Sequence, residues 1–468
     1  MSPIRLRPLR RPTISITTLG CRVNQSESDA LAAQFHRAGY EVLPEGTPAD
    51  VSVVNSCTVT HVADKKSRQL LRRAARARRG GVVVLMGCYA EMVQRPQRQD
   101  ELAALRADCE RDGSQVIVAP RRDRERVFEL VEQVLSGAPP ELDLARPPPR
   151  EPLPLFTEAD LLAPPRPPHL RTRALVKVQD GCDRACAFCI VPRARGRAVS
   201  KPVDRVLDEV RQLVAEAVCE IVLTGVSLGD YGRDWAPDRH GPSALAHLIQ
   251  RILEETAIPR LRLSSINPME FDLAVAALLG HPRVCRHLHL PLQSGSDRVL
   301  TLMRRRHTVA DYRAIVEAAR RAAPDVAVAA DVIAGFPGET PEDHRATVRL
   351  VEDLELADLH VFPYSLRRGT AAALSPTQVP DGEKRRRSHE LLAVKARLRE
   401  RYVRSQLGSV QQVLWEERTG AAWEGVTDSY IRVYARSERA LCNDLLPARL
   451  VALERDGARG ELVSAAQP

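Results

Sequence analysis

Short apolar, β-branched runs alternate with longer stretches of helical periodicity over the first 136 residues. The runs have the length and composition of buried strands, and the stretches repeat apolar positions every three to four residues. The expected strands are 14–19, 51–55, 82–86 and 115–118, and the expected helices are 25–38, 64–79 and 122–135. Such alternation predicts a parallel sheet covered by helices, here an α/β domain of flavodoxin-like type over residues 12–136.

A proline-rich stretch interrupts this pattern at residues 137–169, which hold 11 of the chain's 34 prolines. Proline supplies no backbone donor and fixes its own φ angle, so the stretch favours neither a helix nor a central strand. It is interpreted as an extended linker between domains. A proline-recognition motif is the functional alternative.

After the linker the strand–helix alternation resumes and predicts a second α/β domain over residues 170–404. The expected strands are 174–178, 220–223, 261–264, 287–290, 326–333 and 358–362, with helices between them such as 204–217, 242–255, 309–322 and 341–355. Six such units indicate a partial (β/α)6 barrel, whose functional groups lie at the carboxyl ends of the strands.

The C-terminal residues 405–468 change character. Four short β-like runs occur there, at 410–415, 423–427, 431–434 and 448–453. They predict a small all-β barrel, joined to the preceding domain by a basic helix over 384–404.

Composition narrows the class of protein. The 468 residues are long enough to bury several cores without disulfides, and 44% hydrophobic with 28% charged residues excludes a disordered chain, a collagen and a coiled coil. No apolar run of about 18 residues exists, so no membrane span and a cytoplasmic location are expected. The net charge of +9 favours anionic partners, nucleic acid first. In such a chain the ten cysteines favour metal binding or catalysis over disulfide formation.

The strongest chemical signal is a C-x3-C-x2-C motif formed by Cys182, Cys186 and Cys189, directly after the first strand of the second domain. Three thiolates on one short loop can hold three irons of a [4Fe–4S] cluster and leave the fourth iron open to a ligand. Thiolates also suit zinc, but a structural zinc site needs a fourth protein ligand, and no cysteine or histidine stands at the usual short spacing.

A second set of three cysteines, Cys21, Cys57 and Cys88, follows three successive strands of the first domain. In a flavodoxin-like sheet these strands are neighbours, about 4.8 Å apart, so their sulfurs can converge at one site. The alternative is three buried core cysteines. The remaining cysteines, at 109, 219, 285 and 442, are interpreted as structural.

The segment 65–79 carries eight basic residues and no acidic one. A solvated helix face usually mixes charges of both signs, so this run favours contact with RNA phosphates over a merely solvated face. The candidate RNA contacts are Lys65, Lys66, Arg68, Arg72, Arg73, Arg76 and Arg79.

The loop around Cys182 resembles the radical S-adenosylmethionine (SAM) superfamily, and the two cysteine sets with the β-rich tail resemble the radical-SAM methylthiotransferases. The matching stretches are 178–182, 190–192, 194–197, 223–225, 231–232, 263–265, 290–296, 303–305, 331–340 and 362–365, with Gly229. The segments around Cys21 and Cys182 look most like the branch that modifies N6-threonylcarbamoyladenosine in tRNA. Arg193 and Ser227 depart from the family pattern, and neither is expected to touch the cysteines.

This resemblance implies two [4Fe–4S] clusters, SAM and a TRAM-like RNA-binding barrel at residues 405–468. Cys182, Cys186 and Cys189 would hold the cluster that cleaves SAM to a 5′-deoxyadenosyl radical, and the other set would hold the cluster that delivers sulfur. Phe188 would pack near the adenine of SAM. At strand ends, Thr224 with Gly225 and Gln293 with Ser294 are candidate SAM contacts, with ordinary turn chemistry as the alternative. Asp331 lies mid-strand and is assigned no role.

The implied activity is methylthiolation of C2 of N6-threonylcarbamoyladenosine beside the anticodon of tRNA. It would need a low-potential electron donor and a sulfur source, which the sequence does not identify. The arginines 193, 195 and 304, expected near the barrel mouth, are candidate donors to the polar substituent. Two alternatives keep the chemistry but change the substrate, to isopentenyladenosine in tRNA or an aspartate of a ribosomal protein. A third is an RNA-binding iron–sulfur redox sensor.

Overall fold

In the computed structural model, residues 11–111, 113–137, 172–235 and 243–463 are described. They form two compact units, one drawn from residues 1–170 and 190–197 and the other from 171–189 and 198–468. The predicted linker at 137–169 lies outside the described residues except for Gly137. The segment 190–197 belongs with the first unit, although it follows the second unit's cysteine loop in the chain.

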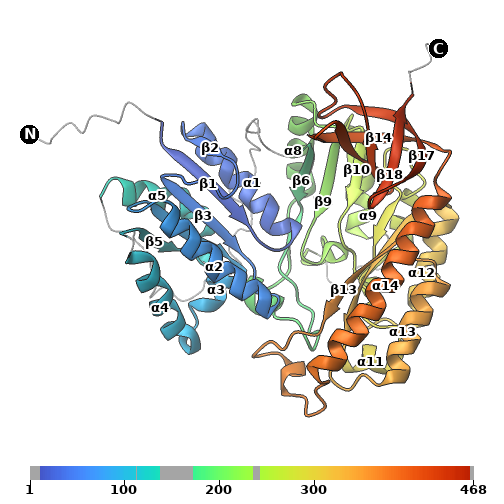
Figure 1. The fold of residues 1–468 in the computed structure, drawn as a ribbon, viewed down its shortest axis with the longest axis horizontal. Coiled ribbons are helices and arrows are strands. Elements are labelled where there is room, and N and C mark those ends of the chain that lie inside the picture. Colours follow the sequence, from blue (N-terminus) through green and yellow to red (C-terminus); the bar gives the residue numbers. More distant parts are fainter. Residues whose placement is uncertain (1–10, 112, 138–171, 236–242, 464–468) are drawn as a thin grey trace, which may run out of the picture. The chain divides into compact units, whose positions relative to one another are not determined.

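The first unit is a five-stranded parallel sheet of order β2-β1-β3-β4-β5 (Figure 1). Its strands are β1 (Thr13–Thr18), β2 (Glu41–Leu43), β3 (Val51–Ser56), β4 (Val82–Gly87) and β5 (Gln115–Val118). Its helices are α1 (Arg22–Arg37), α2 (His61–Ala77), α3 (Cys88–Val93), α4 (Gln99–Glu110) and α5 (Val127–Leu135). The predicted flavodoxin-like α/β domain is confirmed, with β2, α3 and α4 as elements that the sequence pattern missed.

Alternating residues of these strands build two cores. On one face, Ile14, Val53 and Val84 pack with Phe35 of α1 and Leu130 of α5. The opposite face supplies a second set of apolar side chains, which pack against α2 and α4; it includes Val54, Val83, Leu85, Leu71 and Leu105. A parallel sheet covered on both faces leaves only the ends of its strands open for chemistry.

The second unit contains six parallel strands in the order β6-β9-β10-β11-β12-β13, because isolated bridges join β10 to β11. The strands are β6 (Arg173–Lys177), β9 (Glu220–Thr224), β10 (Arg260–Leu263), β11 (His287–His289), β12 (Ala327–Ala334) and β13 (Asp358–Pro363). Helices between them cover the outer face: α8 (Val203–Ala215), α9 (Ala244–Glu255), α10 (Leu273–Leu278), α11 (Asp297–Leu302), α12 (Val309–Ala322) and α13 (Pro341–Asp353). The predicted partial (β/α)6 barrel is confirmed.

The long helix α14 (Asp381–Ser405) follows β13 and leads into a closed barrel of order β14-β15-β16-β18-β17, drawn in red in Figure 1. Its strands are β14 (Val410–Thr419), β15 (Ala422–Thr427), β16 (Arg432–Ala435), β17 (Leu445–Glu454) and β18 (Gly457–Leu462). The predicted small β-barrel is confirmed. The sequence pattern missed β18, whose two glycines and polar residues are typical of a loop.

Buried charge joins this small barrel to the amino-terminal ends of the parallel strands. Glu220 of β9 is fully buried between Arg260 and Arg262 of β10, at 2.5 and 2.7 Å. The two guanidinium groups also donate to backbone carbonyls of Val426 and Asp428, at 3.0 and 2.7 Å. Burial alone would raise the pKa of Glu220, but the two arginine charges lower it to about 2.

Glu220→Ala is therefore expected to destabilise the second unit by about 3–5 kcal/mol, because it leaves two arginines buried without their counter-charge. The pKa of Glu220 is lowered on folding, so its contribution is full above about pH 4.5 and is lost as the pH falls towards 2. Denaturant unfolding at pH 7 measures the effect. Glu255→Ala is the matched control, since Glu255 also pairs with two arginines, Arg211 and Arg251, but on the surface. Equal stability of the two variants would contradict the buried-pair account.

Candidate functional site

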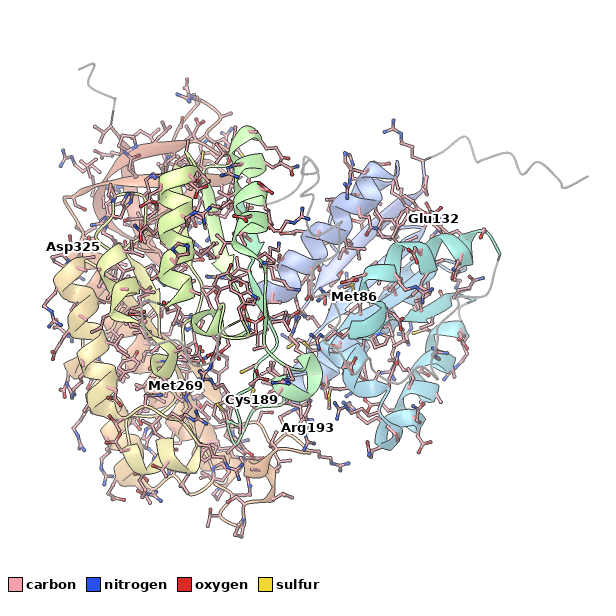
Figure 2. All side chains as sticks on the ribbon, turned by 180° about the vertical axis from the view of Figure 1, so that it is seen from behind. Met86, Glu132, Cys189, Arg193, Met269 and Asp325 are labelled. Carbon is pink, nitrogen blue, oxygen red and sulfur yellow. The ribbon has the colours of Figure 1, made fainter. Side chains whose placement is uncertain are left out.

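The three cysteines of the first set lie where three adjacent strands end. Cys21 follows β1 and caps α1, Cys57 follows β3, and Cys88 opens α3 directly after β4. Because β1, β3 and β4 are neighbours in the sheet, their carboxyl ends meet at one edge. Met86, labelled in Figure 2, marks the end of β4. The expected convergence of the three strand ends is thus present in the fold.

Two glycines let the chain turn tightly enough to bring these thiols together. Gly20 has φ +108°, and a Cβ there would meet the Cys57 side chain at 3.0 Å. Gly87 has φ +88°, and a Cβ there would come within 2.5 Å of the Ser56 carbonyl oxygen. Any larger residue at either position would push the strand ends apart, since left-handed backbone and close approach both require glycine.

The three thiols of the first set influence one another's ionisation. Burial is the main cause that raises the pKa of Cys57 and that of Cys88, the latter to about 12, and the charge of Cys21 contributes to both shifts. Thiols of this kind ionise when a soft metal centre binds them, whereas reactive redox cysteines are exposed and have a low pKa. Among the described residues neither cysteine set brings its sulfurs within the 4.8 Å expected around a single ion. The donor set and spacing fit a cluster better than a zinc ion.

A buried polar network surrounds the first set. Asn24 donates to the carbonyls of Leu19 and Ser56, at 2.8 and 2.9 Å, and so ties the end of β1 to the end of β3. Its side-chain oxygen accepts from the guanidinium of Arg195 at 2.5 Å. The sequence analysis did not predict this role of Asn24.

Arg195 is placed differently from the expectation that it points to the barrel mouth. It lies on α7 (Val191–Arg195), is 5% exposed, and donates to Cys88 Sγ at 3.3 Å. Glu27 holds the other side of the guanidinium at 2.9 Å. The expectation that Arg195 is free to bind substrate is therefore wrong, because the segment 190–197 packs into the first unit. Arg193, also on α7, is exposed and is labelled in Figure 2.

The second set lies on the loop between β7 (Gln179–Asp180) and α7. Cys189 N–H donates to the Cys186 carbonyl at 3.1 Å, which closes a turn that holds these two residues close. The backbone of Ala187 is fixed from both sides, by the carbonyl of Met303 and the amide of Ala372. Figure 2 labels Cys189 on this loop. Burial raises the pKa of Cys182 to about 11, so this thiol too would ionise on binding a metal centre.

Ion pairs anchor the same loop. Arg184 lies between Asp230 and Glu270, with its Nε 3.2 Å from the Glu270 carboxylate. Ser227 donates to Glu270 at 2.8 Å, and its hydroxyl lies near enough to Cys182 to lower the pKa of that thiol. The expectation that Ser227 does not touch the cysteines is therefore wrong. The loop that follows β9 was expected to approach SAM, but its contact with the cysteine loop was not foreseen.

Arg305 is a further residue at this site that the sequence did not single out. It donates to Cys186 Sγ at 3.6 Å and to the Asn267 side chain and the Pro291 carbonyl at 3.0 and 3.2 Å. Thiolate ligands carry negative charge, so a guanidinium beside Cys186 favours a bound cluster. Arg304, its neighbour in the chain, is exposed.

The surroundings of Phe188 and of the first predicted strand-end pair are well defined. Phe188 packs edge-on against Phe336, with ring centroids 6.4 Å apart, beside Ile333. Thr224 is buried at the end of β9. The space that Gly225 leaves is occupied by the side chain of Gln179, which a Cβ would meet at 3.0 Å. Gly225 is therefore needed for packing, whatever else it contacts.

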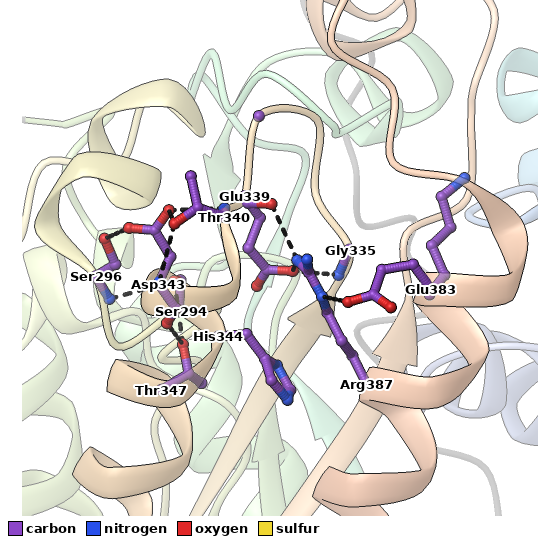
Figure 3. Close-up of polar contacts among 12 residues, drawn as sticks. Ser294, Ser296, Gly335, Glu339, Thr340, Asp343, His344, Thr347, Glu383 and Arg387 are labelled. Carbon is purple, nitrogen blue, oxygen red and sulfur yellow. Dashed lines mark hydrogen bonds and ion pairs between the residues drawn. The ribbon is translucent and has the colours of Figure 1, made fainter.

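Gln293 and Ser294 form the second strand-end pair, and they differ in backbone conformation and in burial. Gln293 adopts a left-handed backbone with φ +70°, a strained conformation that occurs preferentially at functional sites. Ser294 is fully buried, and its hydroxyl lies 3.4 Å from that of Thr347 on α13 (Figure 3). Figure 3 also shows Arg387 of α14 bound to Glu339, whose carboxylate accepts from the amide of Gly335 at 2.7 Å. These contacts fix the loop that carries Phe336.

The basic segment on α2 divides into two groups. Arg68 and Arg72 pair with Glu101 and Asp108 of α4, at 2.8 and 2.7 Å. The acidic partners that the local sequence lacks are therefore supplied by another helix. The other five candidates are exposed and have no ion-pair partner among the described residues: Lys65, Lys66, Arg73, Arg76 and Arg79.

A partial parallel barrel with a three-cysteine loop after its first strand defines a radical SAM enzyme, and the Radical SAM superfamily signature matches residues 176–351. Residues 13–105 match the family described as uncharacterized protein family UPF0004. The chain is 34% identical over 450 residues, 94% of both chains, to the threonylcarbamoyladenosine tRNA methylthiotransferase MtaB of Bacillus subtilis (strain 168). It belongs to the methylthiotransferase family of radical SAM enzymes.

Two further similarities bear on substrate and fold. The tRNA-2-methylthio-N(6)-dimethylallyladenosine synthase of Akkermansia muciniphila is 34% identical over 454 residues, 94% of this chain and 96% of that one. A radical SAM methyltransferase from Kitasatospora setae, solved with cobalamin and a [4Fe-4S] cluster, aligns with TM-score 0.52 and 15% identity over 78% of this chain and 74% of its own. The second similarity supports the fold alone.

Membership in this family identifies the protein as a transferase that uses SAM and [4Fe–4S] clusters. Both cysteine sites fit that cofactor on the geometry above. Among the described residues, no helix combines the length and the apolar character needed to cross a bilayer.

Proposed function

We propose that this enzyme methylthiolates C2 of N6-threonylcarbamoyladenosine beside the anticodon of tRNA. The observation that carries the proposal is full-length similarity to enzymes of that name, which includes 35% identity over 437 residues to the Thermotoga maritima protein. The presence of two three-cysteine sites in one chain supports it, because the reaction has two demands. A radical is needed to break an aromatic C–H bond, and a sulfur atom must be supplied in its place.

Each of these two demands is assigned to one set of three cysteines. Cys182, Cys186 and Cys189 would hold the cluster that, with SAM, supplies the radical, and Arg305 and Ser227 contact this set. The other set would hold the cluster through which sulfur reaches the substrate. In the net reaction the C2 hydrogen leaves in 5′-deoxyadenosine and an S–CH3 group replaces it, with the methyl group drawn from a second SAM.

Isopentenyladenosine in tRNA is the second candidate substrate, because a relative of nearly equal identity is named for a dimethylallyladenosine product. A ribosomal-protein aspartate is less favoured, since the relatives named above are all tRNA enzymes. An RNA-binding iron–sulfur redox sensor is less favoured, since the relatives named above are all enzymes.

Purified holoenzyme is expected to methylthiolate a threonylcarbamoylated anticodon stem-loop and to leave the isopentenylated one essentially untouched. The threonylcarbamoyl group adds a carboxylate, a hydroxyl and a urea, whereas the isopentenyl group is apolar. Donors left unpaired by the wrong substituent cost about 1–3 kcal/mol each, so two or three give discrimination of the order of 10³. Mass spectrometry of the nucleosides measures it. Equal turnover of both stem-loops, or activity only on the isopentenylated one, assigns the enzyme to the sister branch.

The five exposed basic residues of the α2 region support a role in binding the tRNA backbone. They project from one helix and its C-terminal end without acidic partners among the described residues. Arg73 also lines a cavity of about 270 Å³ together with Thr17 and Ser52, and hydroxyls with a guanidinium are suited to phosphate.

Changing Lys65, Lys66, Arg73, Arg76 and Arg79 to Gln is expected to flatten the salt dependence of tRNA affinity by up to about 4 units on a log–log plot. Each lost phosphate contact removes nearly one released counterion. The matched control changes Arg68 and Arg72, which α4 already engages, and should change the slope much less. If the variant with all five substitutions keeps the wild-type slope, these side chains form a solvated face and do not contact tRNA phosphates.

A further inference from the structure

Three polar side chains, none of which is assigned a role above, meet on the inner face of the partial barrel. They are His289 of β11, Asp331 of β12 and His360 of β13. On these strands the alternate residues Leu288, Val332 and Leu359 pack outward against the helices. Because side chains of a strand alternate between faces, the three polar residues point into the barrel. Asp331 and His360 are direct partners in the strand register.

This cluster lies one inward-facing position below the cysteine loop. Two residues further along each strand come Pro291, Ile333 and Phe362, about 6.6 Å nearer the carboxyl end of the barrel. That upper level touches the loop: Arg305 bridges the Pro291 carbonyl to Cys186 Sγ, and Ile333 belongs to the apolar cluster against which Phe188 packs. A group bound at the cluster would therefore sit inside the barrel directly beneath the cysteine loop.

Both imidazoles are oriented by the same carboxylate oxygen. Asp331 Oδ1 lies 2.8 Å from His289 Nε2 and 3.0 Å from His360 Nδ1, and the two rings meet edge-on at 83°. Burial would raise the pKa of Asp331, but the two histidine hydrogen bonds hold it well below its usual range. The aspartate is thus ionised, and each histidine is fixed with its other ring nitrogen directed elsewhere. No partner for His289 Nδ1 or His360 Nε2 occurs among the described residues.

The cluster is open to solvent although it lies inside the barrel. The side chain of His360 is 44% exposed, and those of His289 and Asp331 are 17% and 20% exposed. Packed barrel interiors are filled by apolar side chains, so an accessible layer of histidine and aspartate indicates space for a polar ligand.

We infer that His289, Asp331 and His360 form the subsite that receives the polar N6-substituent of the substrate adenosine. This inference rests on the proposed function. Hydroxyl and urea groups offer both donors and acceptors to the free ring nitrogens, which the shared carboxylate holds in place. An apolar substituent would displace water from these groups without forming hydrogen bonds in its place, which costs free energy. The subsite therefore disfavours an apolar substituent as well as favouring a polar one.

The test compares the affinity of holoenzyme for two anticodon stem-loops, one threonylcarbamoylated and one with unmodified adenosine. The wild-type protein is expected to bind the modified stem-loop about 100-fold more tightly. His360→Asn is expected to reduce that ratio about tenfold, and Asp331→Ala to reduce it further because both rings lose their common acceptor. Iron content and circular dichroism confirm that each variant is folded. His389→Asn is the matched control, since this histidine is exposed on α14 and should leave the ratio unchanged.

Three outcomes distinguish failure of the proposed subsite from failure of the proposed function. Retention of the wild-type affinity ratio in both folded variants overturns the subsite. Detection of one equivalent of zinc or manganese in wild-type holoenzyme, lost in His360→Asn, would also overturn it, because these three residues are a suitable divalent-metal triad. Wild-type preference for an isopentenylated stem-loop instead overturns the proposed substrate, whatever the histidine variants do.

Discussion

Changing Cys21, Cys57 and Cys88 together to alanine is expected to abolish the methylthio product while reductive cleavage of SAM continues. The three thiols lie at the ends of β1, β3 and β4 in the first unit, whereas the cysteines assigned to radical formation lie on a separate loop of the second unit. Loss of the first cluster should therefore remove sulfur delivery alone. Iron should fall from about eight to about four atoms per chain after anaerobic reconstitution.

Product is measured by mass spectrometry of the nucleosides and SAM cleavage by the yield of 5′-deoxyadenosine. The control changes Cys219 and Cys442 to serine, two cysteines outside both sets, and should keep iron, cleavage and product. Formation of product at the wild-type rate by the triple variant would show that the first site is not the sulfur donor. Loss of SAM cleavage along with product would show that the two sites are not separable.

The architecture of both units could be predicted from the sequence because its signal is local. The strands β3, β4 and β12 are mostly apolar, and strands of this kind belong to sheets covered on both faces. The elements that were missed lack such a signal. Strand β2 has only three residues, β18 is rich in glycine, and α4 has a weakly segregated apolar face.

The cysteine ligands were also predictable, since their spacing and their position after strands are properties of the chain order. The residues around them were not. Arg195 is separated from Cys88 by more than a hundred residues, yet it donates to that sulfur. Only packing of α7 into the first unit, through Ile190 and Ala194 against Cys88 and Met92, brings it there. Because Arg195 comes only six residues after Cys189 in the chain, the sequence instead suggests a role for it at the second cysteine set.

Contacts between distant parts of the chain also limit what the charge pattern of the sequence can predict. The run on α2 has no acid within it, so the sequence suggested a uniform basic face. Arg68 and Arg72 nevertheless find Glu101 and Asp108 on α4, about 35 residues away in the chain. Local charge patterning identifies a candidate surface, but tertiary contacts decide which of its members remain available to a partner.

Changing Cys182, Cys186 and Cys189 together to alanine is expected to reduce SAM cleavage to the background level and with it all product. The backbone of their loop is fixed by Met303 and Ala372, and its Arg184 side chain by Asp230 and Glu270, and the substitutions leave these contacts intact. The loop should stay in place while its metal ligands are lost. About four iron atoms should remain, bound by the first set.

The two triple variants are therefore expected to be complementary: each keeps about half of the iron, but only one cleaves SAM. Spectroscopy of the reduced proteins should show one cluster signal in each, with different line shapes, because the surroundings differ. Arg195, Asn24 and Glu27 surround the first set, whereas Arg305 and Ser227 contact the second. Hydrogen bonds and charges near the sulfurs tune a cluster's potential, so the two potentials should differ as well. Full iron retention in the Cys182 set variant, or SAM cleavage that survives it, would contradict the assignment of the radical-forming cluster to this loop.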